Sequence, residues 1–220
     1  MCFSATASFL TTGLTAAMGL ASLRRAKTWR ELPLALAPVF FAVQQGLEGL
    51  LWLNLPAAPD GSLSTGLAFL FLVLAEAFWP IYAPIAVMLI EPDQGRRRLI
   101  LACVAAGLGV GTYLLWYIVN WPHGAVIQDG HIVYINGTKH GVVVALAYLA
   151  GTALPLMLST QRMVVALGGI VLVGLVVAYA LYWEAFVSVW CFFAAAASIM
   201  IVLHFKRVDQ SRLAVVALNK

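Results

Sequence analysis

Long apolar stretches, separated by short polar segments, follow one another along most of the chain. A helix needs about 20 apolar residues to cross the hydrocarbon core of a bilayer. Only 10% of the residues are charged and 63% are hydrophobic, whereas a soluble domain carries about 25% charged residues. The sequence therefore predicts an all-α integral membrane protein with seven transmembrane helices. The predicted spans cover residues 3–23, 33–54, 64–90, 99–119, 141–159, 163–182 and 185–205.

The Lys and Arg residues predict how these helices are oriented. If the N-terminus lies outside, every one of the 13 Lys and Arg residues except Lys139 falls in a cytoplasmic segment. This distribution follows the positive-inside rule, which an even number of spans would break. We therefore predict an external N-terminus and a cytoplasmic C-terminus. The net charge of +4 then reflects topology and does not indicate a nucleic-acid partner.

The chain is expected to form a single seven-helix domain over residues 1–220, with one short β element. AVIQ and HIVYI flank Asp129-Gly130, a dipeptide typical of the type I′ turn of a hairpin. We expect this hairpin between the fourth and fifth spans, over the outer mouth of the bundle. In the fourth span, Gly107 and Gly111 form a small-xxx-small pattern that favours close helix packing.

Polar residues interrupt the second predicted span. Gln45, Glu48 and Trp52 stand at i, i+3 and i+7, and Gln44 lies four residues before Glu48, so these side chains share one helical face. Ionisable residues inside a membrane segment are candidates for function. A glutamic acid bonded to a glutamine can also serve only to hold helices together, and both roles stay open for Glu48. The stripe predicts a polar pocket that opens outward.

The third predicted span carries Glu76 about 18 Å from its outer end, followed by Trp79 and Pro80. Pro80 has no N–H for the carbonyl four residues back, which belongs to Glu76, so we expect a kink and a free carbonyl there. Glu48 and Glu76 are the candidate catalytic residues. The candidate ligand-binding residues are Gln44, Gln45, Trp52, Trp79, Tyr82, Ser188 and Trp190.

Two cysteines are expected on the outer side, Cys2 at the N-terminus and Cys191 in the last span. With His131 of the hairpin they form a candidate site for copper or zinc, because thiolates and imidazole suit these metals. A disulfide between the two cysteines is an alternative, since disulfides persist outside the cytoplasm. Packing of two unpaired thiols is a third interpretation, and the sequence leaves all three open.

Missing residues exclude several membrane functions. Retinal binding needs a lysine in the last span, and residues 185–205 contain none. A zinc hydrolase of the ceramidase type would need several histidines inside the bundle, where the sequence offers only His204 at the inner end. The HExxH, P-loop and CxxC motifs are absent as well.

Five motifs carry a resemblance to a known family: MCFSATASF at 1–9, QQGLEG at 44–49, FWP at 78–80, HIVY at 131–134 and SVWCFF at 188–193. With these motifs the chain resembles a family of uncharacterised bacterial seven-helix membrane proteins. The resemblance covers nearly the whole chain and implies location in the bacterial cytoplasmic membrane, but no reaction. The matching motif positions are Cys2, Ser4, Glu48, Trp79, His131 and Cys191.

Two functional hypotheses follow from this pocket. In the first, the pocket lies in the outer half of the membrane and binds a metal or a small cofactor, with an enzymatic role left open. In the second, the protein is a receptor, transporter or accessory subunit that binds a small amphipathic molecule, and its cysteines are structural. Few polar residues continue through the inner half of the spans, so the pocket is expected to be a dead end. That favours binding or catalysis over transport.

Overall fold

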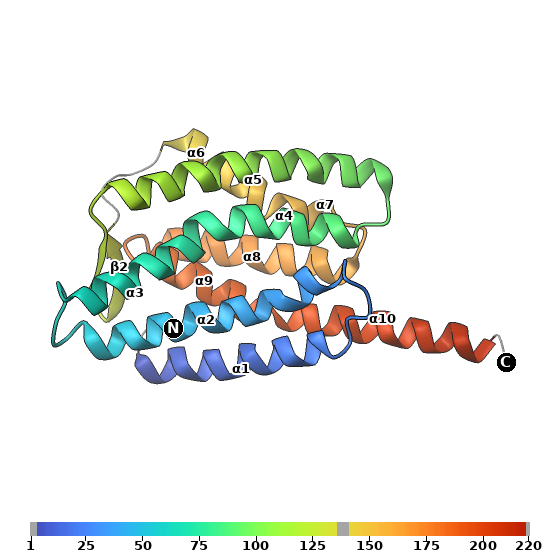
Figure 1. Cartoon of the computed structure of the whole chain (residues 1–220), viewed down its shortest axis with the longest axis horizontal. Coiled ribbons are helices and arrows are strands. Elements are labelled where there is room, and N and C mark those ends of the chain that lie inside the picture. The colour runs from blue at the N-terminus through green and yellow to red at the C-terminus, as the bar shows by residue number, and fades with distance from the viewer. Residues whose placement is uncertain (1–3, 136–140, 219–220) are drawn as a thin grey trace.

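Helices lying side by side build almost the whole molecule, and a two-stranded hairpin covers one end of the bundle (Figure 1). The computed structural model describes residues 4–135 and 141–218. The helices are α1 (Ala5–Leu23), α2 (Leu32–Asn54), α3 (Ser62–Leu72), η1 (Val73–Phe78), α4 (Trp79–Ile90), α5 (Gln94–Asn120), α6 (Val142–Thr152), α7 (Leu154–Leu158), α8 (Arg162–Leu181), α9 (Phe186–Ala197) and α10 (Ile199–Leu218). The strands are β1 (Gly124–Gln128) and β2 (His131–Ile135).

Within the described residues, six helical segments are long and apolar enough to cross a membrane. Each corresponds to one of the predicted spans, and the boundary between the predicted spans 163–182 and 185–205 falls between α8 and α9. The prediction of a mostly helical chain with several membrane-spanning lengths is thereby confirmed. The six segments are Ala5–Leu23, Leu32–Asn54, Ser62–Ile90, Gln94–Asn120, Arg162–Leu181 and Phe186–Arg212.

The predicted fifth span, residues 141–159, forms two short helices, α6 and α7. With 11 residues, α6 is about 16 Å long and cannot cross a bilayer alone. Pro155 explains the break, because it has no N–H for the carbonyl of Gly151 and its ring clashes with that carbonyl. The two helices together still carry the chain to the end of the bundle opposite the hairpin, where Arg96 Nη1 donates to the Leu158 carbonyl at 3.1 Å.

The hairpin has the turn that its sequence predicts. Asp129 and Gly130 adopt positive φ angles of 48° and 73°, as a type I′ turn requires, and Gln128 pairs with His131. Ile132 is buried against apolar side chains of α3 and of the C-terminal part of α2. Gln128 Nε2 donates to Glu184 Oε2 at 2.6 Å, which ties the hairpin to the α8–α9 turn. The hairpin is therefore anchored to three parts of the bundle.

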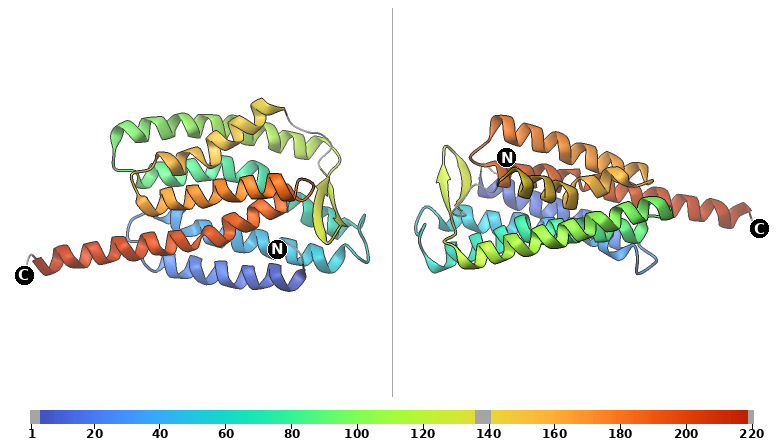
Figure 2. Two further views of the ribbon diagram at one scale, coloured as in Figure 1. Left: turned by 180° about the vertical axis from the view of Figure 1, so that it is seen from behind. Right: turned by 90° about the horizontal axis from the view of Figure 1, so that it is seen from above.

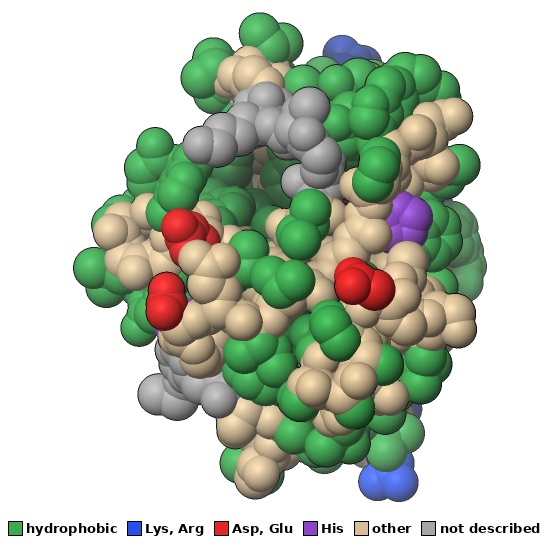
Figure 3. All heavy atoms as spheres, turned by 90° about the vertical axis from the view of Figure 1, so that its left-hand side faces the viewer, with side chains coloured by type: hydrophobic (Ala, Val, Ile, Leu, Met, Phe, Trp, Pro, Cys, Tyr) green, Lys and Arg blue, Asp and Glu red, His purple; other side chains and the backbone are tan. Residues whose placement is uncertain are grey.

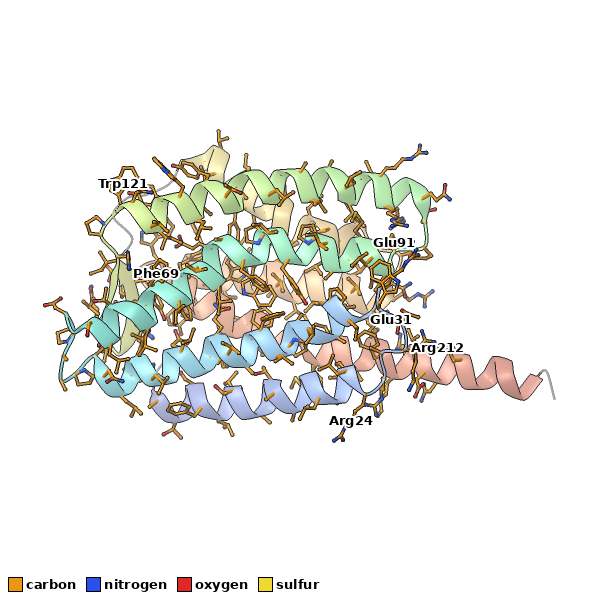
Figure 4. All side chains as sticks on the ribbon, in the orientation of Figure 1. Arg24, Glu31, Phe69, Glu91, Trp121 and Arg212 are labelled. Atoms are coloured by element: carbon orange, nitrogen blue, oxygen red, sulfur yellow. The ribbon has the colours of Figure 1, made fainter. Side chains whose placement is uncertain are left out.

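The basic side chains gather at one end of the molecule. Every Lys and Arg in the described part of the chain lies at the end opposite the hairpin, where Figure 4 labels Arg24 and Arg212. The hairpin end carries Asp60, Asp129 and Glu184 instead. Figure 3 looks onto that end and shows acidic side chains on it, with basic ones only at the far rim. The charge asymmetry read from the sequence is thus present between the two ends of the bundle.

The last helix extends beyond the bundle, away from the hairpin, in both views of Figure 2. Near the point where α10 leaves the other helices, its Arg212 forms an ion pair with Glu31, just before α2. The backbone N–H of Lys27 donates to the same carboxyl at 2.8 Å. Glu31 thus connects the α1–α2 loop to α10.

This connection is expected to weaken in acid. Burial raises the pKa of the Glu31 carboxyl, but the Lys27 N–H and the Arg212 guanidinium outweigh burial and lower the pKa below its ordinary value. A carboxyl whose pKa is lowered by folding stabilises the protein above its unfolded pKa, about 4.3, and loses this effect as the pH falls through the folded value. The unfolding midpoint of Glu31→Gln should therefore lie below that of wild type at neutral pH and converge with it below about pH 4. Asp60→Asn, at the opposite end, controls for loss of one negative charge, and a gap that persists in acid would contradict this assignment.

Candidate functional site

Three polar residues of α2 are buried inside the bundle. Gln44, Gln45 and Glu48 expose 0%, 1% and 0% of their surface. They are enclosed because α1, α4 and α9 all pack against α2. Burying a polar group is unfavourable unless it is hydrogen-bonded, so the partners of these side chains define what the site can do.

The Glu48 carboxyl joins α2 to α9. Ser188 Oγ donates to Glu48 Oε1, and both side chains are fully buried. Gln45 Nε2 lies 3.5 Å from Glu48 Oε2, at the long limit of a hydrogen bond. The predicted common face of Gln45 and Glu48 is confirmed, and Ser188 reaches it from a helix distant in the sequence.

Gln44 connects α2 to α4. Its Oε1 accepts a hydrogen bond from Trp79 Nε1 at 2.8 Å. The ring of Phe41 stacks on Trp79, with centroids 4.0 Å apart and planes inclined by 18°. The Cys191 thiol of α9 lies beside the Gln44 amide. Gln44, Gln45, Glu48, Trp79, Ser188 and Cys191 are called the polar cluster below.

The kink predicted near Pro80 is a π-helical turn, η1, between α3 and α4. In a π-helical turn each N–H bonds to the carbonyl five residues back, as Trp79 does to Leu74. The next carbonyl in this register, that of Ala75, would pair with Pro80, which has no N–H. Tyr148 of α6 donates its hydroxyl to that carbonyl instead, at 2.5 Å.

The position of this carbonyl differs from the sequence-based expectation. An α-helical register predicts that Pro80 leaves the carbonyl of Glu76 without its donor, whereas the π-helical winding shifts this role by one residue to Ala75. The Glu76 side chain is 9% exposed. Tyr148 is the only tyrosine in the predicted fifth span. A single tyrosine in an apolar span was the only sequence feature that pointed to Tyr148. Nothing in the sequence relates this tyrosine to Pro80 or to the carbonyl that Pro80 leaves without a donor.

Replacing Tyr148 with phenylalanine is expected to lower the free energy of unfolding by about 1–2 kcal/mol. The Ala75 carbonyl would lose its hydrogen-bond donor, and leaving a buried acceptor without a partner is unfavourable. Titration of the purified protein with a denaturing detergent in mixed micelles would measure the change. Tyr179→Phe removes a hydroxyl from a side chain that is 61% exposed and should be close to neutral. Equal effects of both variants would contradict the role of Tyr148.

Two apolar cavities adjoin the polar cluster. The smaller, about 80 Å³, lies in the bundle core, and Phe41, Trp79 and Tyr82 contribute to its wall. The larger, about 600 Å³, is enclosed by η1, α5, α6, α8, α9 and the α8–α9 turn. Both cavities have Tyr148, Trp190 and Cys191 in their walls. These three side chains therefore separate the two spaces.

The larger cavity opens on the side of the bundle between α6 and α8. α6 packs against α4 and α5, whereas α8 packs against α7, α9 and α10, so that space remains between the two. Val176 and Tyr179 line the cavity and are 63% and 61% exposed, which places its mouth on the outer surface of the helices. Glu76 is the only carboxyl among the described residues of its wall.

Among the described residues, five of the predicted site residues are not members of the polar cluster, and Glu76 is one of them. Trp52 packs with the hairpin and the ends of α2 and α3. His131 contacts the Tyr182 ring edge-on, with centroids 5.3 Å apart. Tyr82 donates to the Pro33 carbonyl at 2.5 Å, and Trp190 Nε1 donates to the Val171 carbonyl at 3.0 Å. Tyr82 and Trp190 nevertheless line the cavities, whereas Trp52 does not.

The predicted metal site of Cys2, His131 and Cys191 can be placed only in part. Cys2 lies outside the described residues, and Cys191 is a buried free thiol. Among the residues that the structure does describe, no three His, Cys, Asp or Glu side chains group in a way that could hold a metal ion. The copper or zinc site therefore stays a prediction without support from the described residues.

Comparisons with known proteins show what the chain is similar to. No curated protein matches it, and no solved structure matches it. A family model described as a family of unknown function, DUF6629, matches residues 1–217. This match extends over almost the entire chain. The protein therefore belongs to the DUF6629 family of unknown function.

Proposed function

We propose that this protein is a multi-pass membrane protein that binds a small amphipathic molecule in the cavity between α6 and α8. The molecule would come from the bilayer, with its apolar chain between the two helices and its polar head at Glu76. This proposal adopts the second of the two functions that the sequence suggests. The proposed location is the bacterial cytoplasmic membrane, with α6 and α7 together forming the fifth of seven crossings.

The proposed orientation puts the hairpin end outside. It is supported by the basic side chains at the opposite end, which the positive-inside rule assigns to the cytoplasm. The cavity then lies in the outer half of the membrane, where α6 begins. Lipid chains would be the solvent at its mouth.

The proposal rests on the wall of the larger cavity, which is mostly apolar and includes one carboxyl among its described residues, that of Glu76. A volume of about 600 Å³ falls within the usual range of small-molecule sites, which are mostly apolar with a few polar groups. Valine, leucine and aromatic side chains form most of the wall, and Glu76 and Cys191 provide polar atoms. An amphipathic molecule has the same two components.

The polar head is expected to donate hydrogen bonds or to carry positive charge. Among the described residues, the cavity wall contains Glu76 but neither lysine nor arginine. A carboxylate or phosphate head would therefore meet no complementary charge. We infer a long-chain amine or alcohol as the chemical class of ligand, in preference to a fatty acid.

Photolabelling would test this proposal. The experiment uses three probes, a long-chain amine, an alcohol and a carboxylic acid. All three have the same chain length and carry a diazirine in the chain. We expect the amine and the alcohol to label peptides of α6 and α8 in the protein reconstituted in vesicles, and the acid to label them about tenfold less. Preferential labelling by the acid would overturn the proposed head group.

Two neighbouring valines of α6 provide a matched pair of variants. Val144 lines the cavity, whereas Val143 is 77% exposed and does not contribute to its wall. Val144→Trp should fill the cavity and reduce amine labelling by about tenfold, and Val143→Trp should leave it within about twofold. Glu76→Gln should weaken labelling by the amine more than labelling by the alcohol. Equal labelling of wild type and Val144→Trp would overturn the site.

A further inference from the structure

A basic cavity lies at the end of the bundle opposite the hairpin, between the start of α8 and the middle of α10. Its volume is about 680 Å³, and it is separate from the two apolar cavities. Three arginines, a histidine and two hydroxyl groups contribute to its wall. These residues are Arg162, Arg207, Arg212, His204, Thr160 and Ser211.

Two of the three arginines of this cavity have no carboxylate partner among the described residues. Arg212 binds Glu31 through Nη2, but its Nη1 is buried without a hydrogen-bond partner among the described residues. Arg162 and Arg207 have no carboxylate of a described residue within ion-pair distance. The guanidinium groups of Arg162 and Arg207 are exposed and therefore available to an anion.

Apart from Glu31, which pairs with Arg212, two acidic residues near these helices do not line the cavity. Glu91 is 3% exposed and binds the backbone N–H and the hydroxyl of Thr160, at 2.8 and 2.7 Å, as well as the Ser159 hydroxyl at 2.9 Å. It thereby fixes the turn before α8 and does not line the cavity. Asp209 follows Arg207 by two residues, about 200° around the helix, and is also absent from the wall.

The cavity lies at the depth where lipid headgroups would be found. Arg162 is the first residue of one apolar span, and Arg212 is the last residue of another. Arginine binds phosphate oxygens in a forked geometry that lysine cannot reproduce. The N-terminus of α8 adds backbone N–H groups with a favourable dipole for an anion.

We propose that this cavity binds the phosphate group of an anionic phospholipid. The inference is independent of the amphipathic ligand proposed between α6 and α8, because the two cavities share no residue. A free phosphate offers the same chemistry, but the position at the ends of two apolar spans favours a phosphate that is attached to acyl chains.

Native mass spectrometry of the full chain in a neutral detergent would test the site. The probe is dioctanoyl phosphatidylglycerol, with dioctanoyl phosphatidylcholine and inorganic phosphate in parallel titrations. Phosphatidylglycerol should bind most tightly, because the choline cation of the second lipid would be repelled by the arginines. Tighter binding of inorganic phosphate than of phosphatidylglycerol would identify a free anion as the ligand and overturn the lipid assignment.

Two double variants that lose the same charge distinguish binding in this cavity from general attraction to the basic end of the protein. Arg162→Gln/Arg207→Gln removes two cavity arginines, and Arg24→Gln/Arg30→Gln removes two exposed arginines elsewhere at the same end. The first should weaken phosphatidylglycerol binding by about tenfold and the second by less than about twofold. Because all four side chains are exposed, both variants should fold. Equal weakening by the two would overturn the proposal.

Discussion

Gly107→Ala is expected to destabilise the bundle by about 3 kcal/mol or more, the upper range for overpacking. A Cβ atom at Gly107 of α5 would lie 1.8 Å from the Pro80 carbonyl oxygen and 3.5 Å from Gly151 Cα of α6. The first neighbour is backbone, so no side-chain rotation can relieve the clash. α4, α5 and α6 would have to separate. Detergent denaturation in mixed micelles would measure the loss.

Gly109→Ala is the matched control, since a Cβ atom there would have no neighbour within 4 Å. In the same helix, this variant should be neutral or slightly stabilising, because alanine has the higher helix propensity. Similar denaturation curves for the two variants would contradict close packing of α5 against Pro80. A fold that tolerates Gly107→Ala would need a different contact between these helices.

Trp79→Ala is expected to lower the free energy of unfolding by about 3 kcal/mol. The Trp79 side chain is 8% exposed, stacks on Phe41 and donates to Gln44. Its removal would leave a space beside the 80 Å³ cavity and deprive the buried Gln44 oxygen of its donor. The added cavity and the lost hydrogen bond both raise the free energy of the folded state. The same detergent titration would measure their combined effect.

The phenylalanine variant divides this effect into its two parts. Trp79→Phe keeps an aromatic ring against Phe41 but cannot donate to Gln44, so about 1 kcal/mol should be lost. A loss as large as that of Trp79→Ala would assign the whole effect to the hydrogen bond. No loss in either variant would mean that Trp79 does not connect α2 and α4.

The polar stripe of α2 was predictable because helical periodicity alone determines which side chains share a face. Gln45 and Glu48 stand three residues apart, and a buried carboxyl in an apolar helix needs partners on its own face or on a neighbouring helix. Periodicity could not give the lateral arrangement of helices, so the hydrogen bond between Ser188 and Glu48 had to come from the structure.

The roles of Tyr148 and of the cavities depend on relations between helices that no local pattern contains. The sequence indicated a kink at Pro80, but a π-helical turn and an α-helical kink differ in which carbonyl needs a donor. The break after α6 depends on Pro155, which lies inside the predicted continuous span of residues 141–159. The space between α6 and α8 follows from that break and from the packing of α6 on α5.

The divided segment α6–α7 has a consequence for biosynthesis. In the proposed topology α6 and α7 form the fifth crossing together, because α6 alone has only 11 residues, less than the hydrocarbon thickness demands. Gly151 of α6 meets Gly107 and Pro80 so closely that a Cβ atom on it would lie 2.8 Å from the Pro80 oxygen. In that topology, the close packing of α6 on α4 and α5 would hold the divided segment in the membrane, so its integration would depend on these two helices.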